Sequence, residues 1–249
     1  MDPQQRLLLE YGQDSMLATG DVPSDAGVYV GIYCTDFRDA LYKDGFQAHK
    51  TNVYAGQVTL AVASGRLSYC FGLQGPCVTF ETACSAALVA CCAASDSVAS
   101  GGDGSANLAC GVNLLLVPTS SIVLAQAGMT SERGRSFTFD SRADGFARGE
   151  AVAVLTAFAQ SESAPDAAVI RAIKTRSDGR SASLTAPNGQ AQQNLMEAVH
   201  AANSQAQQFP CAHEAHGTGT RLGDPTETRA ASVAMRALSQ QQRQKQISL

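Results

Sequence analysis

Positive charge is sparse in this chain of 249 residues, and lysine and arginine form no cluster anywhere along it. Only 16% of the residues are charged, and the formal net charge is −4. A nucleic-acid-binding surface needs a concentrated positive patch, so the composition argues against that function. The chain also lacks any apolar run that approaches the roughly 18 residues needed for a bilayer-spanning helix.

A secretory signal is missing as well, because the N-terminal stretch MDPQQRLLLE is charged and amphipathic and has no apolar core. We therefore expect a soluble, cytoplasmic protein that binds neither nucleic acid nor a membrane. Hydrophobic residues make up 45% of the chain, which is a globular composition. The length suits one large domain or two small ones.

The eight cysteines include no CxxC motif and no paired Cys/His ligand spacing, so a zinc site is not expected. Their spacing also suggests no disulfide framework. We interpret the cysteines in apolar or strand-like surroundings as reduced, buried thiols: Cys70, Cys77, Cys110 and Cys211.

Apolar segments bounded by turn signals predict strands at residues 28–32, 78–80, 108–117, 151–158 and 168–174. Helical patterns occupy residues 1–17, 53–73, 121–128 and 189–203, and a further helix should start with Asp224 as N-cap and Pro225 in its first turn. Alternating helices and continuously apolar strands predict an α/β protein with buried sheets. Residues 161–166 look like a connection, which suggests domains at 1–160 and 161–249.

Cys84 occupies a chemically favourable position, where the strand at residues 78–80 gives way to a helix that should end near Gly101-Gly102. Unpaired N–H groups and the positive end of the helix dipole favour a thiolate there. The same groups would stabilise negative charge on a carbonyl oxygen under attack. Cys84 is therefore a candidate nucleophile. The alternative is that it is one more small buried side chain.

A second candidate is His216, which precedes Gly217-Thr218-Gly219-Thr220 and, with His213, brackets an expected short strand. The glycines permit close approach of a ligand, and the imidazole suits hydrogen bonding or acid–base chemistry. His216 and Cys84 both follow predicted strands, whose carboxyl ends are where ligands gather in open α/β sheets. His49 and His200 are most simply surface residues. The polar segment 130–150 reads as a long ordered loop.

Six segments in order resemble one family: MDPQQRLLLE, GRLSYCFGLQGPCVTFETACSAAL, GVNLLL, FDSRADGFARGE, LTAPNGQAQ and EAHGTGTRLGDPTE. They are similar to the β-ketoacyl synthase domain of modular, type I polyketide synthases. The resemblance runs through nearly the whole chain. It implies a thiolase-like fold, in which two similar α/β halves stack in five αβαβα layers, and usually a homodimer paired near the nucleophile strand. On this reading, residues 1–160 are the rest of the N-terminal half and residues 161–249 the start of the C-terminal half.

The resemblance also implies roles for individual residues. Cys84 matches the cysteine that receives the acyl chain from an acyl carrier protein, and His216 the first of two histidines that assist decarboxylation of a malonyl-type extender. Thr218 and Thr220 match threonines that contact the carrier's phosphopantetheine arm, and Phe146 matches a phenylalanine over the site. No cofactor or metal of the domain's own is implied.

The chain departs from the family pattern in several places. The family's opening strand, second catalytic histidine, associated lysine and glycine-rich loop have no counterpart here, so we expect a fragment that is inactive or poorly folded alone. Ala86 and Ala87 stand where serines are common, and Glu81 where aspartate is common. We expect these changes to alter pocket polarity without abolishing activity.

Other functions remain open at this point. A non-catalytic ketosynthase-like partner subunit would usually lack the nucleophile that Cys84 supplies. A fatty acid synthase condensing domain would differ in its neighbouring domains, and a thiolase would lack the HGTGT pattern. A cysteine hydrolase would have to release the acyl group to water without condensation.

Overall fold

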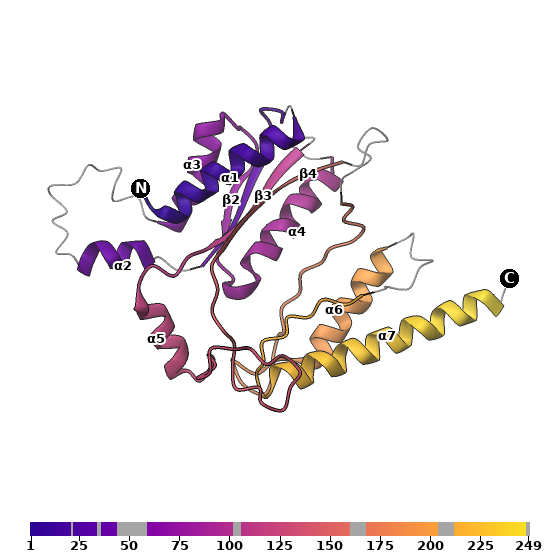
Figure 1. Cartoon of the computed structure of the whole chain (residues 1–249). Helices are drawn as coiled ribbons and strands as arrows, with labels where there is room; N and C mark the ends of the chain where they lie inside the picture. The colour runs from indigo at the N-terminus through magenta and orange to yellow at the C-terminus, as the bar shows by residue number, and fades with distance from the viewer. Residues whose placement is uncertain are drawn as a thin grey trace. The chain divides into compact units, whose positions relative to one another are not determined.

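The computed structural model describes residues 1–20, 22–33, 36–43, 59–101, 106–159, 168–203 and 212–247. The chain forms two compact units (Figure 1). Met1–Val123 and Gly149–Ala168 make up unit 1, whereas Leu124–Arg148 and Val169–Leu249 make up unit 2. The expected connection at residues 161–166 lies outside the described residues. No helix among those described is both long and apolar enough to cross a membrane.

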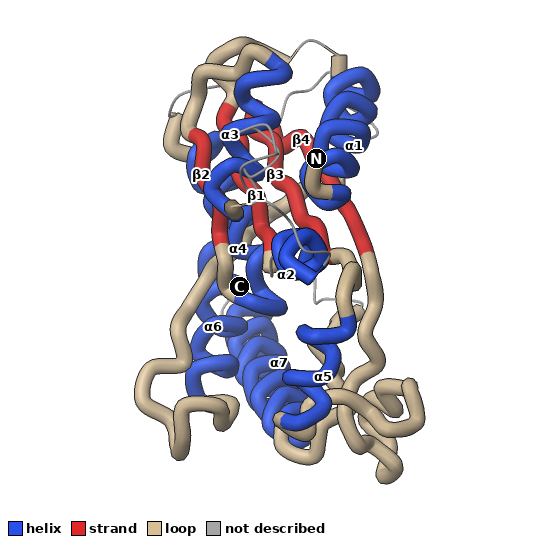
Figure 2. The backbone as a smooth tube through the Cα atoms, turned by 90° about the vertical axis from the view of Figure 1, so that its left-hand side faces the viewer, coloured by secondary structure: helices blue, strands red, loops and turns tan. Residues whose placement is uncertain are grey.

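Unit 1 is built around a four-stranded sheet with the strand order β2-β1-β3-β4 (Figure 2). The strands are β1 (Gly27–Ile32), β2 (Cys77–Phe80), β3 (Ala106–Asn113) and β4 (Ala151–Phe158). Strand β1 is parallel to β2 and β3, and β4 is antiparallel to β3. Helices α1 (Pro3–Thr19) and α3 (Leu60–Phe71) contact one face, and α4 (Ala86–Ala99) covers the other. Helix α2 (Asp36–Lys43) also belongs to unit 1, and α5 (Pro118–Gln126) begins in unit 1 and ends in unit 2.

Alternation along the strands gives the sheet its two apolar faces. Val28, Val30 and Ile32 of β1 belong to a cluster with residues of α1 and α3, which forms the larger core. Tyr29 belongs to a smaller cluster with Ala90 and other small residues of α4 and β3. The face that carries α4 therefore has the smaller cluster, with few large side chains between helix and sheet.

One buried polar side chain, Asn107 of β3, links three elements of unit 1. Its Oδ1 accepts a hydrogen bond from the N–H of Gly27 in β1 at 2.7 Å. Its Nδ2 donates to the carbonyl of Ala94 in α4 at 3.0 Å. Because a buried amide without partners is costly, these bonds specify how helix and strands align.

Unit 2 contains α6 (Gly189–Ala202) and α7 (Gly223–Ile247), which pack against each other. Asn188 caps α6, because its side chain accepts hydrogen bonds from the N–H groups of Gln190 and Ala191. The prediction of strands at residues 168–174 and between His213 and His216 is wrong, since the described residues of both segments are irregular. A strand exists only where a neighbour pairs with it, and no such pairing involves these residues among those described.

Two strand predictions were right in position and wrong in burial. Strands β2 and β4 are edge strands, and large side chains on them are open to solvent: Val78 is 37% exposed and Leu155 is 56% exposed. An apolar run predicts a strand but not whether both its faces are covered.

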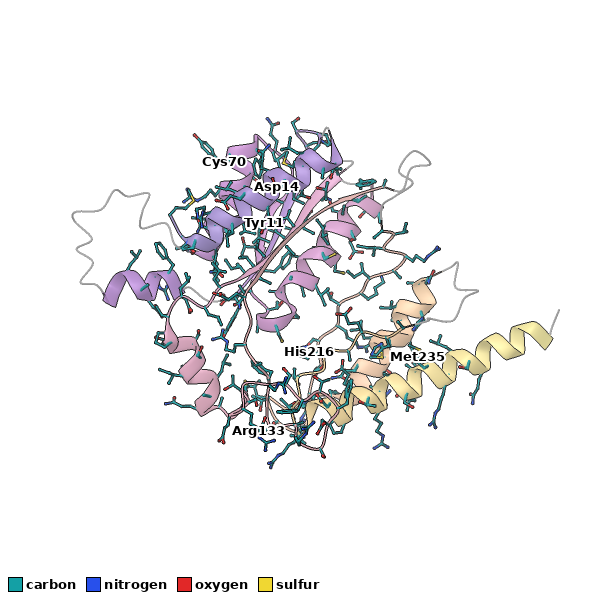
Figure 3. All side chains as sticks on the ribbon, viewed as in Figure 1. Tyr11, Asp14, Cys70, Arg133, His216 and Met235 are labelled. Atoms are coloured by element: carbon teal, nitrogen blue, oxygen red, sulfur yellow. The ribbon has the colours of Figure 1, made fainter. Side chains whose placement is uncertain are left out.

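Two cysteine assignments also need correction, because Cys70 and Cys77 are exposed. Cys70 lies near the end of α3, next to the exposed Tyr69 (Figure 3). Cys77 is the first residue of an edge strand. Cys110 is buried as predicted, and burial raises the pKa of its thiol to about 12. Cys211 lies outside the described residues.

Candidate active site

The strand-to-helix junction predicted around Cys84 is confirmed. Strand β2 ends at Phe80, a single 3₁₀ turn spans Ala83–Ser85, and α4 begins at Ala86. Cys84 is exposed at the centre of this turn. A thiol in this position is accessible from solvent.

The turn itself is strained and internally bonded. Ala83 has a φ of 52°, in the left-handed region that residues other than glycine rarely adopt. The hydroxyl of Ser85 donates to the carbonyl of Thr82 at 2.8 Å. The N–H of Ser85 donates weakly to the same carbonyl at 3.3 Å, and the N–H of Ala86 donates to the carbonyl of Ala83. These two N–H groups are therefore already used by the turn, which the sequence did not predict.

In unit 2, Glu227 in α7 holds the backbone of the loop at residues 216–220, here called the His216 loop. One carboxylate oxygen accepts a hydrogen bond from the N–H of His216 at 2.6 Å, and the other accepts from the N–H of Gly217 at 2.9 Å. Such charge-assisted bonds are shorter and stronger than neutral ones. The position of the His216 backbone therefore depends on a carboxylate eleven residues further along the chain.

Asp224 performs a similar task one turn earlier in the helix. Its side chain is buried, and its two oxygens accept hydrogen bonds from the N–H groups of Gly219 at 2.9 Å and Phe139 at 2.8 Å. The prediction that Asp224 is the N-cap is wrong, because α7 begins at Gly223 and this carboxylate bonds the two loops instead. The first N–H groups of a helix have no partner within the helix. In α7 the hydroxyl of Thr220 accepts a hydrogen bond from one of them, the N–H of Gly223, at 3.1 Å.

The glycines of the His216 loop are required by both conformation and space. Gly217 and Gly219 have φ values of 55° and 68°. A Cβ on Gly217 would lie 2.7 Å from Cγ2 of Thr138, and one on Gly219 would overlap the carbonyl oxygen of Ser136. The loop 130–150 therefore packs directly on the His216 loop.

That packing brings together the residues predicted to bind substrate. The N–H of Gly145 donates to the carbonyl of Gly219 at 2.9 Å, which places the backbone of Phe146 next to the His216 loop. The hydroxyls of Thr218 and Thr220 share a hydrogen bond of 3.0 Å. The hydroxyl of Thr138 donates a hydrogen bond to the carbonyl of Gly217 at 2.5 Å. Hydrogen bonds from loop 130–150 therefore reach the His216 loop at both Gly217 and Gly219.

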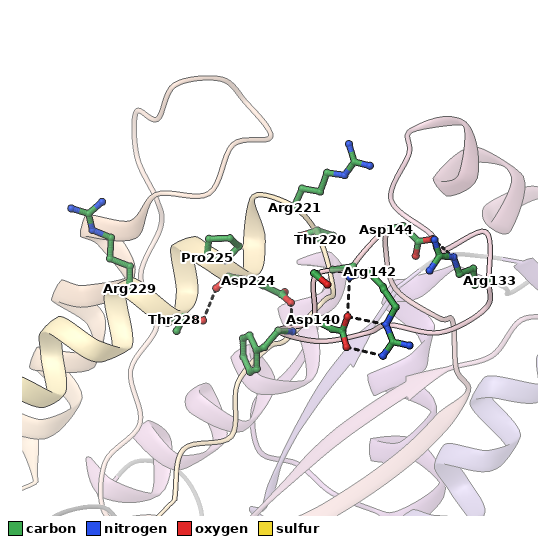
Figure 4. Close-up of a pocket in the computed structure, with 13 residues that line it drawn as sticks. Arg133, Asp140, Arg142, Asp144, Thr220, Arg221, Asp224, Pro225, Thr228 and Arg229 are labelled. Carbon is green, nitrogen blue, oxygen red and sulfur yellow. Dashed lines mark hydrogen bonds and ion pairs between the residues drawn. The ribbon is translucent and has the colours of Figure 1, made fainter.

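A cavity of about 890 Å³ opens beside these loops within unit 2 (Figure 4). Thr220 and Asp224 line it together with four arginines and further loop residues. Arg142 forms an ion pair of 2.7 Å with Asp140, and hydrogen bonds from this guanidinium hold the pKa of the carboxyl well below its ordinary range. Arg133 lies 3.5 Å from Asp144. Both ion pairs join residues within loop 130–150, on its exposed side.

The predicted site residues thus fall into two groups. Phe146, His216, Thr218 and Thr220 lie in adjoining loops of unit 2, whereas Cys84 lies in unit 1. The pairing of Cys84 with His216 stays a prediction.

His213 is exposed, His200 is half-buried, and His49 lies outside the described residues. In the part of the chain that the structure describes, no group of three or more acidic, histidine or cysteine side chains could hold a metal ion.

Comparison with known proteins identifies the family. Residues 1–157 match the family described as "Beta-ketoacyl synthase, N-terminal domain", and residues 167–248 match "Beta-ketoacyl synthase, C-terminal domain". The chain therefore belongs to the beta-ketoacyl synthase family.

Relatives place it with polyketide synthases. It is 39% identical over 245 residues to a highly reducing polyketide synthase of Dothideomycetidae sp. (strain 11243), covering 94% of this chain and 9% of that protein. It is 38% identical over 251 residues to a hybrid PKS-NRPS synthetase of Talaromyces variabilis, covering 94% of this chain and 6% of the relative. The chain thus spans only a small part of each relative.

Solved structures confirm the thiolase-like α/β fold. The ketosynthase from module 6 of the bacillaene synthase of Bacillus subtilis 168 is 28% identical with a TM-score of 0.78, covering 95% of this chain and 41% of that one. An oxazolomycin ketosynthase domain from Streptomyces albus JA3453 is 26% identical with a TM-score of 0.81, covering 94% and 42%.

Proposed function

We propose that this chain is part of a polyketide-synthase ketosynthase that forms carbon–carbon bonds between acyl units. Cys84 takes up an acyl group from the phosphopantetheine arm of an acyl carrier protein, and a malonyl-type thioester then condenses with that group. The observation that carries this proposal is the exposed thiol of Cys84 on a strained turn between β2 and α4. Family membership supports the same reaction.

In the first step, the Cys84 thiolate attacks the carbonyl carbon of the incoming acyl thioester. The carbon–sulfur bond to the carrier breaks, and the carrier leaves as a thiol after taking up a proton. Backbone dipoles at the start of α4 favour the negative charge on sulfur before the attack. The product is an acyl thioester on Cys84, with no net oxidation or reduction.

In the second step, the malonyl-type thioester loses carbon dioxide and becomes an enolate. The enolate carbon attacks the thioester carbonyl on Cys84, and the Cys84 thiolate leaves as the β-ketoacyl product forms. His216 donates a hydrogen bond to the enolate oxygen, which stabilises charge that develops during decarboxylation. Glu227 supports this role by bonding the backbone N–H of His216 at 2.6 Å.

The partner in both steps is an acyl carrier protein, whose arm passes the hydroxyls of Thr218 and Thr220 and the ring of Phe146. We also propose that the full-length protein is a homodimer. The position of β2 at the edge of the sheet supports this, because an edge strand offers unpaired backbone groups to a second copy.

Mass spectrometry of the full-length protein after incubation with an acyl-thioester donor tests the proposal. We expect an acyl group on the peptide that contains Cys84, lost in Cys84→Ala, and a β-ketoacyl product only when a malonyl-type thioester is added. Absence of the thioester would support a non-catalytic partner subunit. Release of free acid without condensation would indicate a hydrolase.

A further inference from the structure

Two glycines lie opposite each other on the α4 face of the sheet. Gly31 of β1 and Gly111 of β3 are partners in the parallel register. Each is two residues beyond a residue of the cluster under α4, Tyr29 in β1 and Ala109 in β3. Because side chains alternate along a strand, both glycines face α4 and leave a gap in that face.

The first turn of α4 fills this gap. A Cβ on Gly31 would overlap the carbonyl group of Ala86 and the backbone nitrogen of Ala87. A Cβ on Gly111 would lie 2.7 Å from the Cβ of Ala87. Glycine within a strand commonly marks a close approach of another backbone, and here the approaching backbone is the helix that follows Cys84.

The contact is two residues away from the thiol. Ala86, which is buried, follows Cys84 and Ser85 directly. Ala83, which precedes Cys84, has a left-handed backbone conformation. Neither the backbone that faces Gly31 nor the Cβ of Ala87 that faces Gly111 can rotate away, because a Cβ is fixed to its backbone. A side chain at either glycine would therefore displace the turn.

We propose that Gly31 and Gly111 are positioning residues that set the location of the Cys84 thiol at the start of α4. This inference rests on the proposed role of Cys84 as nucleophile. Gly31 allows the backbone at the start of α4 to approach β1 closely, and Gly111 leaves room for the Cβ of Ala87. Displacing this turn moves the sulfur relative to the N-terminal dipoles of α4 and slows its reactions.

Alkylation by iodoacetamide, mapped cysteine by cysteine with mass spectrometry, tests the proposal in the full-length protein. The exposed Cys70 and Cys77 are internal references, and the buried Cys92 and Cys110 report unfolding. In Gly111→Ala we expect the Cys84 rate, relative to Cys77, to fall roughly tenfold, because a sulfur moved away from the helix N-terminus loses the interaction that favours its reactive thiolate form. The pH profile of the Cys84 rate should shift to higher pH.

A rescue variant separates positioning from general damage. Adding Ala87→Gly to Gly111→Ala removes the atom that clashes, so the Cys84 rate should return towards that of the parent. Gly65→Ala is the control, because a Cβ there meets nothing within 4 Å. Gly31→Ala should slow Cys84 at least as much as Gly111→Ala.

Three outcomes would overturn the proposal: an unchanged Cys84 rate in Gly111→Ala, failure of Ala87→Gly to restore it, or new reactivity of Cys92 and Cys110 alongside the loss. The alkylation rate does not depend on acyl transfer. A protein that fails to form an acyl thioester but shows the expected alkylation pattern would therefore contradict the proposed function and leave the positioning role supported.

Discussion

The two regions that carry the candidate chemistry are held in place by different forces. The turn around Cys84 depends on close backbone packing, where Gly31 and Gly111 admit the first turn of α4. The loop around His216 depends on charge, because Asp224 and Glu227 accept hydrogen bonds from its backbone N–H groups. Both arrangements are sensitive to added volume, because a Cβ on Gly219 would also overlap the carbonyl oxygen of Ser136, but only the second depends on carboxylate acceptors. Loss of an acceptor should therefore affect the His216 loop and leave the turn around Cys84 unchanged.

The largest effect should follow Gly219→Ala. Gly219 combines a positive φ of 68° with overlap of any Cβ on the carbonyl of Ser136, so we expect unit 2 to be destabilised by about 3 kcal/mol or more. Gly179→Ala is the matched control, because its φ is 62° but a Cβ there meets nothing within 4 Å. The control should cost about 1–2 kcal/mol from strain alone. Thermal unfolding, monitored by limited proteolysis of unit 2, measures the destabilisation in both variants. Equal destabilisation in the two variants would show that packing against loop 130–150 is unimportant.

Asp224→Ala should come next. It leaves the buried N–H of Gly219 and the partly buried N–H of Phe139 without their acceptor, which costs roughly 2–3 kcal/mol. Glu214→Ala removes the same charge from an exposed position in the same unit and should change stability little. Chemical denaturation of the two variants makes the comparison. Equal effects would mean that charge itself, rather than the bonded loops, sets the stability of unit 2.

High pH should affect unit 1 through Cys110. Burial raises the pKa of this thiol from 9.0 to about 12, so above pH 9 the unfolded chain loses a proton that the folded chain keeps. The free energy of unfolding should therefore fall with rising pH between 9 and 12, by roughly 1.4 kcal/mol per pH unit from this group. Cys110→Ala should lose this contribution. Parallel pH profiles for the parent and the variant would contradict the assignment.

The smallest effect should come from the exposed pair of Arg142 and Asp140. The pair keeps the pKa of Asp140 low, so its contribution is present above the ordinary aspartate range and fades as pH falls below it. Water screens an exposed pair, so Arg142→Ala should shift Tm less than Asp224→Ala, and less still in high salt. A Tm loss as large as that of Asp224→Ala would show that the cavity edge, rather than α7, holds the loops.

Local sequence signals predicted most of unit 1. The β4 strand has the predicted ends, and the junction at Cys84 follows from β-branched residues before it and small helix-forming residues after it. Helix α2 was missed, because it is short and polar and its buried Asp36 bonds the N–H groups of Leu116 and Val117 from a distant segment. A hydrogen bond between segments 80 residues apart produces no periodic pattern of apolar residues in the sequence.

The sequence supplied candidate site residues, whose roles stay predictions, but it did not reveal the groups that hold their loops in place. The motif around His216 pointed to a functional loop, but backbone bonds to Glu227 cannot be seen in a pattern of residue types. The spacing of Asp224 and Glu227, three apart at the start of a helix, was the available signal, but only Asp224 was interpreted, and as a helix cap. The strand glycines Gly31 and Gly111 also carried a signal, since glycine weakens a strand unless something approaches it closely.

The most direct test asks whether the thiol of unit 1 and the imidazole of unit 2 serve one site. His216→Cys in the full-length protein, treated with a short bifunctional thiol reagent and mapped by mass spectrometry, measures their proximity. A cross-link between position 216 and Cys84, in preference to the exposed Cys70 and Cys77, is the predicted result. Cross-links from position 216 that never include Cys84, although Cys84 itself is alkylated, would contradict it.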